Sequence, residues 1–357
     1  MNINWLNKKP INSELVTKYL SESLLLNKFT NGGPCVKYLE SLLFDLLEVA
    51  PHKSLILVNN GTAALHAIIS MFNLTFNREL KWATSSYTFP VSAQGPLKGS
   101  LIVDIDEDCG PDLTQIDPNQ VDGIIVTNVL GHLTNLDKYQ QWVTQHQKIL
   151  ILDNAATACS YYHNTNSINI GTASIISLHH TKPIGFGEGG IIIIDKEYEN
   201  HIRKVINFGY DMIKMDQLWH PEGSNYKMSD IAAAYILQYL TNYQHIKHTH
   251  LQLYQQFLDG LKDISDVTPF PNYSERVPFV SCMPVIFSKK ISLDEFKDYP
   301  IEIKKYYKPL NLEHTKSMDL YNRIICFPCN IDMKKEDVDY FLTILKNKIT
   351  QLKADGL

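Results

Sequence analysis

The sequence predicts an α/β fold, in which a large domain with a mostly parallel sheet between helices precedes a small C-terminal α+β domain. Short apolar runs recur between residues 55 and 194, each bounded by polar or glycine residues. Helical patterns lie between several of these runs, as expected for parallel strands joined by crossover helices. At 357 residues, the chain is long enough for a large domain plus a smaller one.

The first strong element that we expect is an amphipathic helix over residues 33–49, because its leucines and valines fall on one helical face. The strands that we expect next are the apolar runs at 55–58, 101–104, 123–129, 148–153, 174–178 and 191–194. Helical patterns at 62–72 and 136–147 separate some of them. This alternation favours a parallel sheet with helices on both faces.

Long helices are predicted after Ser229, a residue type that often caps a helix N-terminus, first over 230–243 and then over 246–264. The rest of the chain contains two apolar stretches, 277–287 and 323–329, and an amphipathic end at 336–352. This combination indicates a small α+β domain. We therefore predict a large domain at 1–245, including an N-terminal helical segment, and a small domain at 246–357.

Composition narrows the class of partner. The formal net charge is -5 and 20% of the residues are charged, so no basic excess suggests a nucleic-acid or anionic membrane surface. We expect small-molecule substrates instead. No apolar run approaches the length of a membrane span, and the start MNINWLNKKP lacks the pattern of a signal peptide, which predicts a cytoplasmic protein.

The six cysteines are scattered along the chain without the spacing of a disulfide framework. Only Cys326 and Cys329 form a C-x-x-C pair, which closes an apolar run instead of opening a helix. A structural zinc site would need a second pair. We expect these two cysteines to pack at a strand end, and we expect no metal site.

A glycine-rich stretch, HHTKPIGFGEGGIIIID from 179 to 195, contains the G-x-G-x-x-G spacing at Gly185, Gly187 and Gly190. A dinucleotide-binding loop with this spacing must follow a strand and open a helix, because the pyrophosphate sits on the helix N-terminus. These glycines lead instead into the β-branched run 191–194. We therefore expect a sharply turning loop between two strands, and no nicotinamide site.

The same loop carries His179, His180 and Lys182. Neighbouring residues on a strand point to opposite faces, so one metal site could hardly use both histidines. We expect packed or turn histidines there. A lone loop lysine is usually a solvated charge, but three further features suggest that Lys182 faces an organic phosphate with a basic aromatic ring.

The first feature is the stretch LILVNNGTAALHAIISMF, where a buried strand passes through Asn59, Asn60 and Gly61 into a helix beginning near Thr62. Free N–H groups and the positive end of the helix dipole meet at such a turn, and Thr62 adds a hydroxyl. This combination predicts a phosphate site. A plain capped helix is the alternative.

The second feature is Asp153, which ends the predicted strand 148–153 at the sheet edge where such folds bind ligands. A carboxylate there could pair with a protonated pyridine nitrogen and keep the ring cationic. A helix N-cap is the alternative role for Asp153. The third feature is Ser177, five residues before Lys182, whose hydroxyl could donate another hydrogen bond to a phosphate.

At these residues the sequence resembles the DegT/DnrJ/EryC1/StrS family of sugar aminotransferases, which use pyridoxal phosphate in a type I aminotransferase fold. NNGTAALHA is similar to the family's SGTAAL turn, SYTFPVSA to its aromatic segment, and LILDNAATA to its strand-end aspartate region. The most specific similarities are SLHHTKPIGFGEGGIIIID, the lysine loop, and GSNYKMSD, the family's G-x-N-Y-R-M-S-D element. YYKPL and ICFPCNIDMKKEDVDYF extend the resemblance over nearly the whole chain.

The resemblance implies an enzyme that moves an amino group from an amino acid, expected to be glutamate, to a keto sugar, expected to be nucleotide-linked. The product would be an amino sugar for cell-surface polysaccharide biosynthesis. It further implies that Lys182 forms the covalent link to the cofactor, that Asp153 pairs with the pyridine nitrogen, and that Phe89 stacks on the ring.

The phosphate of the cofactor would be held, by the same resemblance, by Gly61, Thr62 and Ser177. Asn225 would reach in from the second subunit of a homodimer with shared active sites. We expect residues lining the sugar pocket to come from segments 207–226, 30–34 and 304–308.

Three positions depart from the family pattern. The family's D-x-x-Q or D-x-x-H becomes Asp153 and Ala156, so the hydrogen bond to the ring's 3-oxygen is missing or comes from a neighbour such as Asn154 or Thr157. The arginine of N-Y-R-M-S-D is Lys227, and the histidine of the family's H-L-Y-G segment is Asn128. A keto sugar without a nucleotide is therefore an alternative substrate.

Other functional classes stay open at this point. A regulatory or scaffolding relative could keep the fold without turnover, and the missing glutamine is the feature that favours it. Dehydratases related to this family replace the lysine with histidine, and Lys182 argues against that chemistry. A nicotinamide dehydrogenase would need a strand-to-helix glycine loop, which the sequence lacks.

Overall fold

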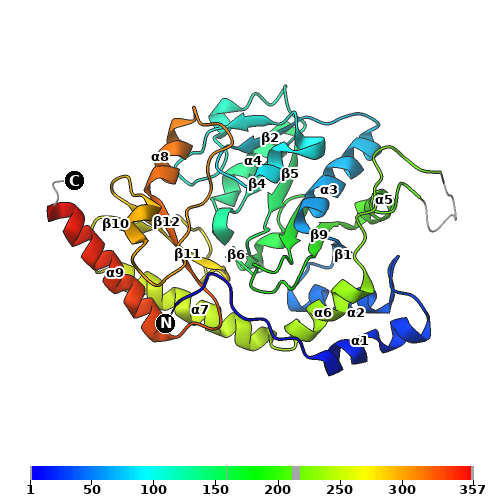
Figure 1. The fold of residues 1–357 in the computed structure, drawn as a ribbon. Coiled ribbons are helices and arrows are strands. Elements are labelled where there is room, and N and C mark those ends of the chain that lie inside the picture. The colour runs from blue at the N-terminus through cyan, green and yellow to red at the C-terminus, as the bar shows by residue number, and fades with distance from the viewer. Residues whose placement is uncertain (1, 158, 211–217, 355–357) are drawn as a thin grey trace.

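Two sheets organise the molecule, which we describe from a computed structural model covering residues 2–157, 159–210 and 218–354 (Figure 1). The large sheet has the strand order β1-β9-β8-β5-β4-β2-β3. Its strands are β1 Lys53–Val58, β2 Trp82–Ser85, β3 Leu101–Val103, β4 Gly123–Thr127, β5 Ile149–Asp153, β8 Ala173–Ser177 and β9 Gly190–Asp195. β9 runs antiparallel to both of its neighbours, and the other pairs are parallel.

The small sheet is antiparallel, with the order β10-β11-β12, and it belongs to the C-terminal part of the chain. Its strands are β10 Val267–Pro269, β11 Cys282–Phe287 and β12 Ile324–Pro328, and a separate short hairpin pairs β6 Tyr161–Tyr162 with β7 Thr165–Asn166. The α-helices are α1 Ser13–Leu25, α2 Pro34–Leu46, α3 Gly61–Phe76, α4 Leu136–His146, α5 Glu199–Val205, α6 Asp230–Leu240, α7 Tyr243–Leu261, α8 Thr315–Arg323 and α9 Lys335–Ala354.

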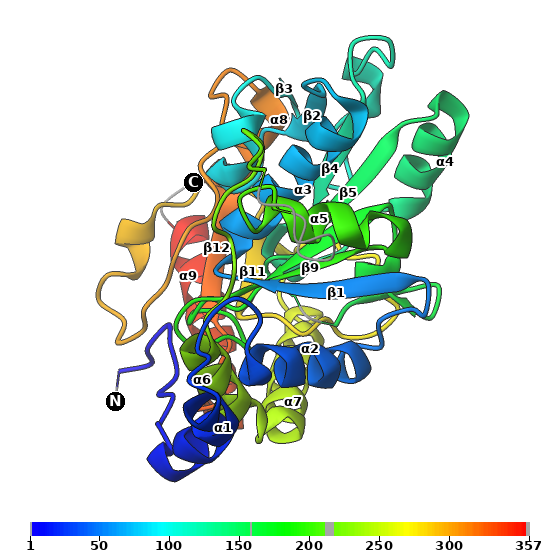
Figure 2. The same ribbon diagram turned by 90° about the vertical axis from the view of Figure 1, so that its right-hand side faces the viewer.

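Strand β9 explains why helices cover both faces of the large sheet. Its four isoleucines are fully buried, and they point alternately to the two faces. Ile191 and Ile193 pack with residues of α2 and α6, whereas Ile192 and Ile194 pack with residues of α3 and α5. Figure 2 shows β1 and β9 between these two helical layers. The predicted α/β class is confirmed.

The sequence prediction missed one strand of the large sheet, β2, which lies second from its edge. The segment Trp82–Ser85 contains a threonine and a serine and has no apolar run of its own, yet all four residues are buried. β2 lies between β3 and β4, so both of its edges are paired. The hydrogen-bond ladder places these polar residues inside the sheet, which a periodicity argument cannot detect.

The domain boundary near residue 245 stays a prediction. Residue 245 lies inside α7, which contributes to two apolar clusters. Its first turn, with Tyr243 and Ile246, packs with residues of the large sheet, while Leu253 and Phe257 pack with residues of the small one. Ser229 caps α6 as expected, because its hydroxyl accepts a hydrogen bond from the backbone N–H of Ala232 at 3.2 Å.

Two of the other sequence predictions concern cysteines and membranes. Cys326 lies within β12 and Cys329 one residue beyond it, and both are buried free thiols. No described helix combines the length and the apolar character that a membrane crossing requires. The cytoplasmic location stays a prediction.

Candidate active site

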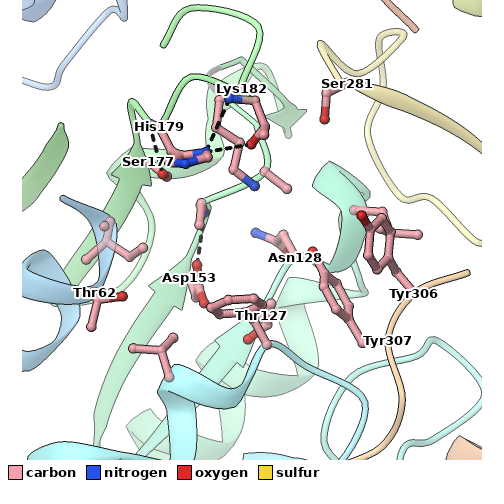
Figure 3. Close-up of a pocket in the computed structure, with 18 of the residues that line it drawn as sticks. Thr62, Thr127, Asn128, Asp153, Ser177, His179, Lys182, Ser281, Tyr306 and Tyr307 are labelled. Atoms are coloured by element: carbon pink, nitrogen blue, oxygen red, sulfur yellow. Dashed lines mark hydrogen bonds between the residues drawn. The ribbon is translucent and has the colours of Figure 1, made fainter. Parts of the chain in front are cut away.

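A pocket of about 430 Å³ opens at the carboxyl ends of the central parallel strands. Such strand ends are where open α/β sheets bind ligands. Of the seven residues that the sequence singled out, six line this pocket: Gly61, Thr62, Phe89, Asp153, Ser177 and Lys182. Figure 3 shows Lys182 and Asp153 reaching into it from different elements, with Tyr306 and Tyr307 on the opposite side.

One end of the pocket is the turn between β1 and α3. The side chain of Asn60 caps the helix by accepting a hydrogen bond from the backbone N–H of Ala63 at 2.8 Å. Gly61 lies directly against β8, since a Cβ at this position would come within 3.1 Å of the Cβ of Ser177. Gly61, Thr62 and Ser177 therefore line the pocket together at the N-terminus of α3, as an anion site requires.

Asp153 lies at the end of β5 with only 1% of its surface exposed. Its Oδ1 accepts a hydrogen bond from the backbone N–H of Ala155 at 2.9 Å. The residues that follow form a turn and no helix, so Asp153 is not a helix cap. Burial raises the pKa of this carboxyl, while the Ala155 hydrogen bond and the charge of Lys182 oppose that rise.

Lys182 lies in the loop between β8 and β9, as expected from the sequence. The loop turns sharply, because the backbone N–H of Lys182 donates to the carbonyl of His179 at 2.8 Å and that of Gly185 donates to the carbonyl of Lys182 at 3.1 Å. A Cβ at Gly185 would lie 2.0 Å from the carbonyl oxygen of His179, so only glycine fits there. Burial lowers the pKa of Lys182, and the Asp153 carboxylate partly opposes this shift.

The two histidines of the loop are turn residues. Nδ1 of His179 accepts the backbone N–H of Thr181 at 3.2 Å, and Nδ1 of His180 accepts that of Gly187 at 3.3 Å. His179 also lines the pocket, which the sequence did not indicate. No cluster of three or more potential metal ligands occurs among the described residues.

Asn225 is the one predicted site residue that does not line this pocket. It is exposed, and its backbone pairs with that of Asn207 in an isolated bridge. Its role as a residue supplied by a second subunit therefore stays a prediction.

The outer side of the pocket combines residues from distant segments. Lys304, Tyr306 and Tyr307 line it, as expected for segment 304–308. Phe89, which is 52% exposed, meets the ring of Tyr307 edge-on with the ring centroids 6.0 Å apart. No residue of the predicted segment 30–34 and none of the described residues of 207–226 lines it, and residues 211–217 lie outside the described part of the chain.

Several lining residues were not identified as site residues from the sequence: Trp5, Thr127, Asn128, Ser281 and Cys282. Thr127 ends β4 and Asn128 follows it, beside β5, so the strand-end rule that selected Asp153 could have found them too. Trp5 comes from the N-terminal segment, Cys282 begins β11 of the small sheet, and Ser281 precedes it. No local sequence signal places those three at the pocket.

A buried pair of amides lies where β4 and β5 end. Asn128 donates a hydrogen bond from Nδ2 to Oδ1 of Asn154 at 2.6 Å, and both residues are buried. Oδ1 of Asn128 and Nδ2 of Asn154 find no partner among the described residues. Neither Asn154 nor Thr157, the two expected substitutes, lines the pocket, whereas Asn128 does. If the oxygen and nitrogen positions are exchanged in both amides, the hydrogen bond between them is kept with its direction reversed. The amino group of Asn128 then takes the place of its unpartnered oxygen.

The chain is similar to known proteins over most of its length. Residues 10–346 match the model of the DegT/DnrJ/EryC1/StrS aminotransferase family. The chain is 24% identical over 348 residues to dTDP-4-amino-4,6-dideoxy-D-glucose transaminase of Shigella dysenteriae, covering 89% of this chain and 91% of the relative.

Solved structures with the same fold are also numerous. Helicobacter pylori PseC, an aminotransferase involved in the biosynthesis of pseudaminic acid, matches 98% of this chain and all of its own, with a TM-score of 0.81 and 18% identity. DesI, solved in the presence of its TDP-sugar product, matches 97% of this chain and 93% of its own, with a TM-score of 0.78 and 20% identity. The predicted aminotransferase fold is confirmed.

Proposed function

Since the chain belongs to the DegT/DnrJ/EryC1/StrS aminotransferase family and is a pyridoxal-phosphate-dependent sugar transaminase, we propose that it aminates a nucleotide-linked keto sugar. We expect glutamate as the amino donor and an amino sugar for cell-surface polysaccharides as the product. The observation that carries this proposal is the convergence of Lys182 and Asp153, from two different elements, in one pocket beside a helix N-terminus.

The pocket fits pyridoxal phosphate at each of its functional groups. The N-terminus of α3 with Thr62 and Ser177 suits the phosphate, and Gly61 places no side chain against Ser177 there. The carboxylate of Asp153 suits the ring nitrogen, and Phe89 suits the ring face. Asn128 suits the 3-oxygen when its amide is turned so that the amino group takes the place of the unpartnered Oδ1 and donates to that oxygen. When bound, the cofactor would supply an electron sink for negative charge at the Cα of the amino acid.

Lys182 would act as the proton carrier of the reaction. An amine must be neutral to accept a proton, and the lowered pKa of Lys182 increases the neutral fraction near neutral pH. The same neutral amine can attack an aldehyde. Lys182 would therefore first hold the cofactor. Once the amino donor has displaced it, the free amine of Lys182 would accept the proton from the Cα of that donor.

Asp153 would hold a proton on the ring nitrogen. A carboxylate surrounded by apolar walls interacts strongly with a cation at contact distance, because the local dielectric is low. Burial raises the pKa of Asp153, and a cationic ring beside it would lower that pKa again by favouring the ionised carboxylate. The carboxylate and the ring cation would stabilise each other.

The nucleotide-linked sugar is supported by the name of the Shigella relative, which acts on a dTDP-sugar. The outer side of the pocket offers aromatic rings at Tyr306 and Tyr307 and a cation at Lys304, groups that suit a sugar carrying a negatively charged phosphate. The experiment is to supply dTDP- and UDP-linked keto sugars and the free keto sugar with glutamate, and to detect the amino sugar by mass spectrometry. Amination of the free sugar alone would favour the alternative substrate.

The cofactor role is tested without any sugar. Purified protein mixed with pyridoxal phosphate should develop a visible absorbance band that disappears when glutamate is added. Borohydride reduction followed by peptide mapping should locate the label on Lys182. A protein without affinity for the cofactor, or a label on another residue, would overturn the proposal.

We also propose that the active form is a homodimer in which Asn225 of one subunit completes the site of the other. The exposure of Asn225 outside its own pocket is compatible with this role. Mixing inactive Lys182→Ala and Asn225→Ala subunits should restore activity, since one of the two sites in a mixed dimer would contain both intact residues. Absence of recovery after verified subunit exchange would refute the shared site.

A further inference from the structure

The N-terminal segment, residues 2–12, lies along both parts of the molecule before α1 begins. Ile3 exchanges backbone hydrogen bonds with the segment around Ile301, and Trp5 donates its backbone N–H to the carboxylate of Glu302 at 2.7 Å. At the other end of the segment, Asn12 donates its backbone N–H to the side chain of Gln238 in α6 at 3.1 Å. The segment is therefore anchored at both ends, and Lys9 lies between the anchors.

The amine of Lys9 contacts the loop that carries Lys182. Its Nζ donates to three backbone carbonyl oxygens, those of His180 at 2.7 Å, Lys182 at 2.9 Å and Gly185 at 2.6 Å. It also lies 4.7 Å from the centroid of the Tyr239 ring. One side chain thus reaches across more than 170 positions of sequence to three carbonyls of one loop.

The geometry matches the chemistry of an ammonium group. A protonated lysine has three N–H donors and no acceptor, and here it meets three acceptors and an aromatic face. Burial lowers the pKa of Lys9 to about 7. The three carbonyl oxygens favour the protonated amine, because they accept its hydrogen bonds. The amine of Lys9 therefore provides a hydrogen-bond donor for loop carbonyls that take no part in the pairing of β8 with β9.

We propose that Lys9 is a positioning residue for Lys182, which it holds through the backbone of the loop. The carbonyl that it binds at Lys182 is that of the reactive residue itself, so the contact fixes the point from which the Lys182 side chain enters the pocket. This inference rests on the proposed role of Lys182. Its physical basis is that reactions lose much of their rate when the reacting group is displaced by about 1 Å.

The neighbouring lysine provides a matched control. Lys8 is exposed, and the hydrogen bond that it forms with Asp332 uses its backbone N–H at 2.7 Å and not its amine. Lys8→Met and Lys9→Met therefore remove the same charge from adjacent positions, and only the second removes the three contacts to the loop. A general effect of charge or of the N-terminal segment would appear in both variants.

The experiment compares the wild-type holoenzyme with Lys9→Met, Lys9→Gln and Lys8→Met. For Lys9→Met we expect kcat for the glutamate half-reaction to fall by about 10–100-fold, with KM for glutamate changed by less than about threefold. The pH midpoint of the absorbance change of the bound cofactor should shift, because the environment of the Lys182 nitrogen changes. Amide hydrogen exchange should accelerate at residues 179–187.

Lys9→Gln keeps two N–H donors without the charge, and we expect a smaller loss in the same direction. If Lys9→Met does not fold, the same measurements on Lys9→Gln test the inference. Lys8→Met should match the wild type. A Lys9→Gln or Lys9→Met holoenzyme with wild-type kcat, pH midpoint and hydrogen exchange would overturn the inference, as would an equal loss in Lys8→Met. If the wild type itself bound no cofactor, the proposed function would fail instead.

Discussion

The two sides of the pocket are assembled in different ways. The side that we propose for the cofactor, called the cofactor side below, comprises Gly61, Thr62, Asp153, Ser177 and Lys182, all of which lie at ends of strands of the large sheet or in the turns that follow them. The other side, which we propose for the sugar and call the substrate side, comprises Trp5, Lys304, Tyr306 and Tyr307, which come from the N-terminal segment and from the segment between β11 and β12. The cofactor side is thus built on one sheet, whereas the substrate side is formed where separate segments of the chain meet.

The substrate side depends on contacts between the two parts of the molecule. The hydroxyl of Tyr87 donates to the carbonyl of Tyr306, and the backbone N–H of Leu310 donates to the carbonyl of Ser86 at 2.9 Å. Lys304 exchanges backbone hydrogen bonds with Cys326 of β12. This segment is thus bonded to both sheets. The comparison predicts that changes on the cofactor side reduce the chemical rate, whereas changes on the substrate side mainly alter KM.

The strongest test of this comparison is Lys182→Ala. The variant loses the group that we propose binds the cofactor and moves the proton, so we expect kcat to fall by about 10³-fold or more. Steady-state turnover and borohydride labelling measure the two roles separately. Turnover within tenfold of wild type would contradict both the site and the comparison.

Asp153→Asn should have the next largest effect. The amide has nearly the same shape as the carboxylate, but it cannot stabilise a cationic ring nitrogen in a buried site, and we expect a loss in kcat of roughly 10²–10³-fold. Absorbance spectra would verify that the variant still contains cofactor. A variant that is saturated with cofactor and fully active would exclude the proposed role of Asp153.

The pH dependence of cofactor capture sharpens the assignment of Lys182. Only the neutral amine attacks an aldehyde, and its fraction falls about tenfold for each pH unit below the pKa. Because burial lowers the pKa of Lys182, the capture rate should rise with pH and level off at a pH below the ordinary lysine pKa of 10.5. Stopped-flow absorbance of the apo protein with pyridoxal phosphate measures this midpoint. A midpoint at or above the ordinary value would contradict the lowered pKa.

Asn128→Ala tests whether the buried amide pair belongs to the cofactor side. Loss of one hydrogen bond to the cofactor should weaken its binding by about 5–10-fold. Thr157→Val is the control, because the hydroxyl of Thr157 bonds to Ser160 and does not line the pocket. Equilibrium titration of the apo proteins compares them. Equal affinities of Asn128→Ala and wild type would remove Asn128 from the cofactor side.

Lys304→Met should produce the smallest change and probe the other half of the comparison. We expect KM for the sugar substrate to rise by about 3–5-fold with kcat unchanged, because Lys304 is partly exposed and exposed charges contribute little. Lys308→Met, an exposed change in the same segment outside the pocket, is the matched control. A fall in kcat without a rise in KM would show that the two sides are not functionally distinct.

Much of the fold could be predicted because the signals are local. Each apolar run predicted as a strand of the large sheet became one, and the lysine loop lies between two strands as expected. β2 was missed because Thr84 and Ser85 are buried by pairing with neighbouring strands, which no window of sequence contains. Asn128 is different, because it follows the end of β4 and the rule that selected Asp153 could have selected it as well.

The sequence by itself determined the cofactor side of the pocket, since Asp153, Ser177 and Lys182 follow from where strands and turns end along the chain. Only the tertiary structure decided that Lys9 meets the carbonyls of the lysine loop and that Trp5, Lys304 and Tyr307 share one space with them. The reason is physical: side-chain alternation and helix capping act over a few residues, whereas a contact across 170 positions depends on the path of the whole chain.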